Sequence, residues 1–90
     1  MATMVNKLSA YPNPFVNNIT IEISTDADDH AILRLRERKG KILRMFSWNI
    51  FKGSNLCSLN DLDDLVPGDY ILDAVNEEGV VMGNAKIMRK

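Results

Sequence analysis

The feature of this chain that most restricts its fold is an alternation of apolar and polar residues with a period of two. The alternation recurs in residues 19–23, 31–36, 42–50 and 69–75. A period of two is typical of β-strands with one buried face, because successive side chains on a strand point to opposite sides of the sheet. No stretch of ten or more residues repeats its apolar positions every 3.6 residues, as an amphipathic helix would. The chain is therefore predicted to be all-β.

Clusters of Gly, Pro, Asn and Asp separate the alternating segments, as expected of tight turns. Gly40 and Gly79 each mark a hairpin turn, Gly53 marks a further turn, and Pro67-Gly68 marks a corner. Three further strands complete the pattern, at residues 5–10, 55–59 and 80–88. About seven short strands joined by tight turns predict an immunoglobulin-like antiparallel β-sandwich. We expect its core to contain Ile21, Leu33, Phe46, Trp48, Tyr70 and Leu72, with Phe46 and Trp48 as the central cluster.

The length of 90 residues is enough for one domain. The single cysteine, Cys57, excludes an internal disulfide, so the apolar core must stabilise the fold alone, and a buried, inert thiol is expected there. No apolar run approaches the length of a membrane span, and the N-terminus lacks the apolar segment of a signal peptide. We expect residues 1–7 to be expression or linker residues and residues 8–90 to form the domain.

Motifs that carry catalytic chemistry are missing from the sequence. It contains no Gly-rich phosphate loop, no Cys-x-x-Cys pair and no Gly-x-Ser-x-Gly elbow. His30 is the single histidine, which excludes a histidine-based zinc site, and we expect it to be a solvated turn residue. The prediction is a protein that is not an enzyme, with no catalytic residues, no cofactor and no metal.

Two kinds of charged cluster leave a binding role open. The acidic groups at 26–29 and 61–64 offer oxygen ligands for calcium, but they lack the spacing of a known calcium loop, and a turn role is favoured. A basic hairpin follows the first alternating strands, and its cationic residues are Arg34, Arg36, Arg38, Lys39, Lys41 and Arg44. We expect a solvated face that prevents sheet-to-sheet association, with binding of an anionic polymer as the alternative.

Structural residues appear in a characteristic order along the chain. Tyr11-Pro12-Asn13-Pro14-Phe15 comes first, and the two prolines make it a stiff, extended strap. Pro67-Gly68-Asp69-Tyr70 follows, where the Tyr70 hydroxyl is expected to anchor a corner. The sequence ends with Lys86-Ile87-Met88-Arg89-Lys90. In this order and spacing, over residues 8–90, the chain closely resembles the type IX secretion (Por-type) C-terminal sorting domains of exported Bacteroidetes proteins.

The resemblance implies a non-catalytic sorting signal that directs a secreted cargo protein across the outer membrane. Its implied partners are the outer-membrane type IX translocation machinery and a sortase-like peptidase, with no nucleic acid and no membrane insertion. The implied location is the periplasm in transit, then the cell surface or the medium. The recognition candidates are Gly68, Asp69, Tyr70, Lys86, Arg89 and Lys90. We further expect residues 86–90 to be read by the machinery rather than needed for folding, because chain ends usually add little stability.

The main alternative is an adhesive or carbohydrate-binding β-sandwich module of a surface protein. It would require an exposed aromatic ring on which a sugar stacks, and Trp48 is the candidate for that platform. Nucleic-acid binding through the basic hairpin is a third possibility, supported only by local charge.

Overall fold

The computed structural model describes residues 5–90, which form seven β-strands and no helix. The strands are β1 (Val5–Tyr11), β2 (Ile19–Thr25), β3 (Asp29–Glu37), β4 (Ile42–Ile50), β5 (Gly53–Leu59), β6 (Gly68–Val75) and β7 (Val81–Arg89). The all-β prediction is confirmed, and the predicted strands agree with the observed ones to within about two residues at each end. This part of the chain accordingly holds no helix that could cross a membrane.

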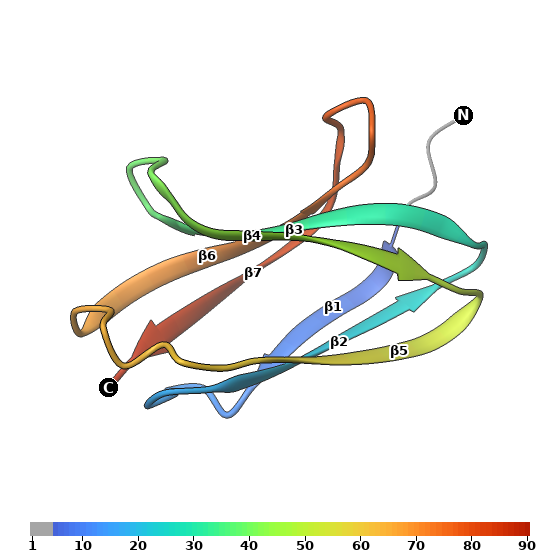
Figure 1. Cartoon of the computed structure of the whole chain (residues 1–90). Coiled ribbons are helices and arrows are strands. Elements are labelled where there is room, and N and C mark those ends of the chain that lie inside the picture. The colour runs from blue at the N-terminus through green and yellow to red at the C-terminus, as the bar shows by residue number, and fades with distance from the viewer. Residues whose placement is uncertain (1–4) are drawn as a thin grey trace.

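The strands form two antiparallel sheets that pack face to face (Figure 1). One sheet has three strands in the order β1-β2-β5, and the other has four in the order β4-β3-β6-β7. The predicted sandwich is therefore present. β1 begins at Val5, three residues before the expected domain boundary at Leu8, and residues 1–4 lie outside the described part of the chain.

The predicted alternation places the apolar side chains between the two sheets. On β2 and β3 every second residue is buried and the side chains between them are partly solvent-accessible, whereas β6 alternates at first and is buried on both faces over residues 72–75. The large aliphatic side chains that are fully buried on these strands are Ile19, Ile21, Ile23, Leu33, Leu35 and Leu72. Their burial drives the association of the sheets, because apolar surface removed from water is the main favourable term in folding.

The prediction that Phe46 and Trp48 form the centre of the core is wrong. Phe46 and Trp48 point inward from β4, opposite Leu33 and Ala31, but both are only half-buried and pack against the margin of the core. β4 is an edge strand, so its inward side chains have a neighbouring strand on one side only. The aromatic rings of the interior are those of Phe15, which is fully buried although it lies outside the named strands, and of Tyr70, which is 4% exposed.

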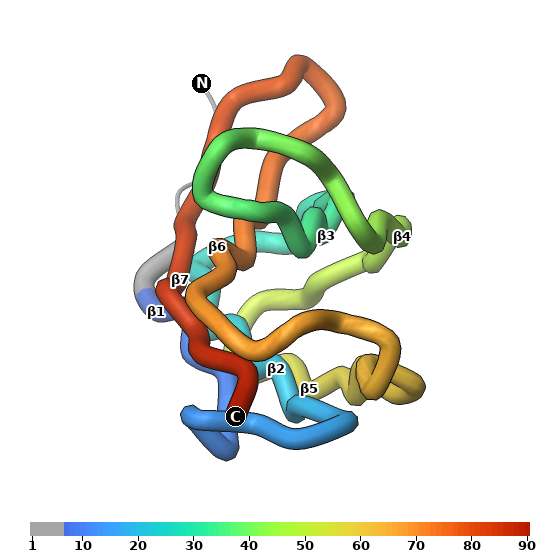
Figure 2. Tube along the Cα trace, turned by 90° about the vertical axis from the view of Figure 1, so that its left-hand side faces the viewer, coloured from blue at the N-terminus to red at the C-terminus, as the bar shows by residue number. Residues whose placement is uncertain are grey.

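Phe15 belongs to the predicted strap, here defined as residues 11–15, which links the two sheets. The chain leaves β1 in the three-stranded sheet and crosses to β7 at the edge of the other sheet (Figure 2). The Phe15 N–H donates to the Met88 carbonyl at 2.8 Å, and the Lys90 N–H donates to the Phe15 carbonyl at 2.8 Å. These two bonds form a short parallel bridge, so the strap closes the side of the sandwich on which β7 lies.

Candidate functional site

The Tyr70 side chain anchors the corner before β6, as the sequence predicted. Tyr70 is buried to 4% exposure, and its hydroxyl donates to the carbonyl of Val66 four residues earlier. Gly68 lies between them with φ of +146°, a backbone conformation that side-chain-bearing residues rarely adopt. The corner thus fixes where β6 begins and how Asp69 is presented.

Antiparallel pairing brings this corner against the end of β7. Gly68 lies opposite Arg89, Asp69 opposite Met88, and Tyr70 opposite Ile87. The two groups of recognition candidates, which are well separated in the sequence, are therefore neighbours across one pair of strands. Side chains alternate on each strand, so Asp69 and Met88 point outward while Tyr70 and Ile87 point into the core.

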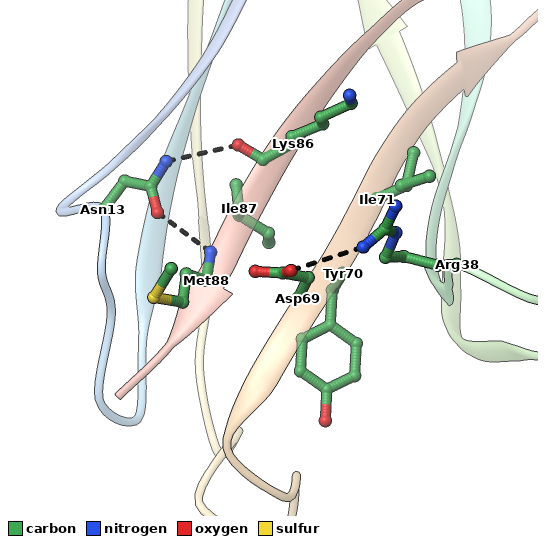
Figure 3. A pocket seen from close by; sticks show the side chains of 8 residues that line it. All are labelled: Asn13, Arg38, Asp69, Tyr70, Ile71, Lys86, Ile87 and Met88. Carbon is green, nitrogen blue, oxygen red and sulfur yellow. Dashed lines mark hydrogen bonds and ion pairs between the residues drawn. The ribbon is translucent and has the colours of Figure 1, made fainter.

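A groove of about 290 Å³ lies on this surface (Figure 3). We call it the β6–β7 groove, and its lining residues are Asn13, Arg38, Asp69, Tyr70, Ile71, Lys86, Ile87 and Met88. A second hollow of about 340 Å³ adjoins it and shares Arg38, Asp69 and Tyr70. An apolar floor with a few polar groups on its rim is the usual make-up of a recognition surface.

The cations of the chain fall into two classes according to their acidic partners. Arg34 and Arg36 both bond the same oxygen of Asp73, at 3.1 Å and 2.6 Å, and the Asp73 side chain is 2% exposed. Arg44 bonds Asp64 at 2.6 Å. These three arginines of the basic hairpin are thus compensated by short ion pairs, and two of them neutralise a buried carboxylate that would otherwise be costly.

The second class has a weak acidic partner or none, and two of its members, Arg38 and Lys86, line the groove. Lys86, on the groove wall, has no acidic partner among residues 5–90. Arg38 lies 3.5 Å from Asp69, but both side chains are more than half exposed, so that pair is weak. The β6–β7 groove therefore offers positive charge to a partner, although Lys39, Lys41 and Lys52 elsewhere on the surface also have no acidic partner among residues 5–90.

The other two basic candidates lie beside the groove instead of lining it. Arg89 is half-buried, and its guanidinium donates to the Lys90 carbonyl at 2.6 Å. Lys90 is exposed, and its backbone N–H is the group bonded to Phe15. Both residues are held next to the groove by the same strap contacts.

Residues 86–90 are part of the folded structure, which argues against the expectation that they are dispensable for folding. They pair with the first residues of β6, and Ile87 is buried to 3% exposure. The strap bonds Met88 and Lys90 from the other side. A chain end that has a neighbour on each side and a buried side chain contributes to stability.

The acidic clusters serve turns and ion pairs in this structure. Asp28 accepts the Lys52 N–H at 2.8 Å, and Asp29 accepts the His30 N–H at 2.8 Å. Within residues 5–90 no three His, Cys, Asp or Glu side chains approach closely enough to hold a metal ion. His30 lies on β3 rather than in a turn, half-buried, with its Nδ1 3.0 Å from Glu77 Oε1.

Cys57 lies on the edge strand β5, opposite Ile21, and is half-buried. Desolvation raises the pKa of its thiol above the ordinary value, which disfavours the reactive thiolate at neutral pH. This agrees with the expected inert thiol, although the expected full burial is not reached.

Sequence reasoning missed Asn13, Arg38 and Ile71 of the groove, and it reached Ile87 and Met88 only as part of the segment 86–90. Asn13 was assigned only to the extended strap, and Arg38 only to the basic hairpin. Asn13 could have been singled out from its sequence context. It lies between two prolines, which have no backbone N–H to donate, and its side-chain amide can both donate and accept hydrogen bonds.

Solved structures with a similar fold come from enzymes. β-Glucosidase 3B from Thermotoga neapolitana matches with a TM-score of 0.56 and 10% identity, over 97% of this chain and 16% of the enzyme. The GH3 β-glucosidase of Bifidobacterium adolescentis matches with a TM-score of 0.55 and 9% identity, over 98% of this chain and 17% of the enzyme. The chain spans about one sixth of these enzymes, so the likeness concerns the fold of one domain. No curated protein matches in sequence.

The comparison with protein families matches nearly the whole chain to one family. The family described as "Secretion system C-terminal sorting domain" matches residues 9–88, which is nearly the whole chain. Domains of this family are in general non-catalytic, are recognised by the type IX secretion machinery, and imply export to the cell surface or the extracellular space. The strap, the Tyr70 corner and the basic end of β7, on which the resemblance was recognised, all lie within the matched residues or at their border. The chain belongs to the type IX secretion C-terminal sorting domain family.

Proposed function

We propose that this domain is a non-catalytic sorting signal that directs a cargo protein across the outer membrane, and that its β6–β7 groove is the surface that the translocation machinery reads. The family match carries the first part of the proposal. The second part is supported by the meeting of Asp69, Tyr70 and Lys86 in one groove. The cargo passes through the periplasm before translocation, and a sortase-like peptidase then removes the domain.

The charges around the groove favour a partner with acidic groups beside an apolar contact. Lys86 and Arg38 supply positive charge on the rim, and Ile71 and Met88 supply the apolar surface. Met88 is 46% exposed, so its side chain is accessible for an apolar contact. Complementary charge steers the encounter and fixes orientation, whereas the apolar contact supplies affinity.

The proposal is tested with a periplasmic reporter fused to residues 1–90 in a type IX-competent host. We expect the intact fusion at the cell surface or in the medium and a Lys86→Glu fusion retained in the periplasm. Lys52→Glu is the matched control, because Lys52 is also exposed but does not line the groove. Circular dichroism of each isolated domain verifies folding. Retention of the intact fusion would reject the sorting function, and equal export of the Lys86→Glu fusion would remove the groove from the signal.

The alternative of a carbohydrate-binding module is not supported at Trp48, the platform expected for it. It required an exposed ring at Trp48, but that side chain is half-buried and packs against the core. The similarity to glucosidases is one of fold at about 10% identity and brings no binding site with it. The anionic-polymer alternative is weakened in the same way, since Arg34, Arg36 and Arg44 are already paired.

A further inference from the structure

β7 is an edge strand, and an edge strand normally exposes backbone groups with which another strand can pair. Partners that recognise a folded domain by strand addition use such an edge. On the last residues of β7 these groups are already occupied. The Asn13 side chain donates from Nδ2 to the Lys86 carbonyl at 3.2 Å, and its Oδ1 accepts the Met88 N–H at 2.9 Å (Figure 3). Phe15 bonds the next two groups along the strand, the Met88 carbonyl and the Lys90 N–H.

These four bonds form a continuous series along one edge. Asn13 makes two of them with one side chain, because a primary amide carries both a donor and an acceptor and so imitates the peptide group of a neighbouring strand. Pro12 and Pro14, on either side, have no N–H with which to do the same. The strap thus takes the place that an added strand would occupy.

We infer that Asn13 is a positioning residue for recognition: it keeps the edge of β7 closed, so that the partner reads side chains on the outer surface of β6 and β7 instead of pairing with the β7 backbone. This inference rests on the proposed function of the groove. Asn13 also lines the groove, next to Lys86 and Met88. Its two bonds hold the backbone of the residues whose side chains form the groove wall, which sets how Lys86 is presented.

The two modes of recognition predict opposite effects of opening this edge. If the partner adds a strand to β7, removing the Asn13 amide frees two backbone groups and improves export. If the partner reads side chains held in place by Asn13, the same change reduces export. Because Asn13 is exposed and the Phe15 anchor remains, an Asn13→Ala domain is expected to keep its fold.

The first measurement is amide hydrogen exchange in the isolated 90-residue chain. Asn13→Ala should speed exchange at the Met88 amide by roughly an order of magnitude, because that amide loses its acceptor. Asn18→Ala is the matched control: it removes the same side-chain type from the same connection, and the Asn18 amide bonds only its neighbour Asn17. Unchanged protection of Met88 in Asn13→Ala would overturn the inference.

The second measurement is export of the reporter fusions. Asn13→Ala should reduce export several-fold under conditions where circular dichroism shows a folded domain, and Asn18→Ala should leave it unchanged. Asn13→Asp keeps the acceptor for Met88 but loses the donor to Lys86, so intermediate export is expected. If Asn13→Ala does not fold, Asn13→Asp decides between the two modes. Unchanged or increased export of the folded variant overturns the inference.

The export experiments distinguish failure of this inference from failure of the sorting function on which it rests. Loss of export in Lys86→Glu with normal export in Asn13→Ala means that the groove is read but Asn13 does not position it. Retention of the intact fusion rejects the sorting function itself, whatever the exchange data show.

Discussion

At the scale of single residues, a few polar side chains fix the connections between strands. The Tyr70 hydroxyl bonds the Val66 carbonyl at the corner before β6. The Asn76 side chain, buried to 6% exposure, accepts the N–H groups of Glu78 and Val80 in the predicted turn between β6 and β7. Each of these bonds satisfies a backbone group that the sheet does not pair, so each stabilises the fold while setting a local direction of the chain.

Tyr70→Phe tests the contribution of the corner. The substitution keeps the buried ring but leaves the Val66 carbonyl without its donor, so the free energy of unfolding should fall by about 0.5–1.5 kcal/mol. Urea denaturation of the isolated domain measures this difference. Tyr11→Phe is the control, because Tyr11 is 44% exposed and should change stability little. Equal effects of the two substitutions would contradict the assigned role of the Tyr70 hydroxyl.

At the scale of elements, β7 joins recognition to stability. Its outward side chains include Lys86 and Met88 of the groove, and its inward Ile87 is buried in the core. It pairs with β6 along its length and with the strap at its end. A signal placed on such a strand is presented only when the strand is folded, which ties recognition of the domain to its native state.

Deletion of residues 86–90 should therefore destabilise the domain. Loss of the buried Ile87 side chain alone should cost about 1.5–3 kcal/mol, and the backbone pairing with β6 and the strap is lost in addition. Thermal and urea denaturation of the truncated chain measure the loss. The double variant Lys86→Ala with Lys90→Ala removes two charges, keeps the strand, and should stay within about 0.5 kcal/mol of the original. Unchanged stability of the truncated chain would show that residues 86–90 are not needed for folding.

At the scale of the whole molecule, the sandwich is stabilised by apolar side chains between two sheets, without a disulfide. Among the described residues the one cysteine is free, and the interior is filled by aliphatic residues of β2, β3 and β6 together with Phe15. Small domains bury a modest share of their surface, so each large core side chain accounts for a substantial part of the stability. The edge strands β4 and β5 contribute less, because most of their inward side chains reach only the margin of the core, with the fully buried Ile50 of β4 as an exception.

Alanine substitutions of large side chains measure how the contribution of a residue to stability falls from the centre of the core to the surface. Leu33→Ala should lower the free energy of unfolding by about 2–5 kcal/mol, because Leu33 is fully buried. Leu56→Ala is the matched control, since Leu56 is 63% exposed, and should cost no more than about 0.5 kcal/mol. Trp48→Ala should fall between them, in keeping with its half-buried ring. A loss for Trp48→Ala larger than that for Leu33→Ala would restore Trp48 to the centre of the core.

The local features of this protein were predictable from its sequence. The period-two alternation predicted the inward residues of β2, β3 and β6, since strand geometry alone decides which side chains share a face. Gly40 predicted the hairpin between β3 and β4, where its N–H bonds the Glu37 carbonyl at 2.9 Å with φ of +113°. The Tyr70 corner was predictable for the same reason, because donor and acceptor lie four residues apart. Family membership followed from the order of such local features along the chain.

Only the tertiary structure decided the features that depend on which strands are neighbours. The Asn13 bond to Met88 joins residues 75 apart, and the Arg36 bond to Asp73 joins residues 37 apart. The order β4-β3-β6-β7 makes β4 an edge, which leaves Trp48 half-buried, and it makes β7 the edge that the strap covers. Residue periodicity specifies the face of a strand but not its neighbours. The position of a strand in its sheet is set by packing the whole chain around one core, and that packing brought Asn13, Asp69 and Lys86 to one groove.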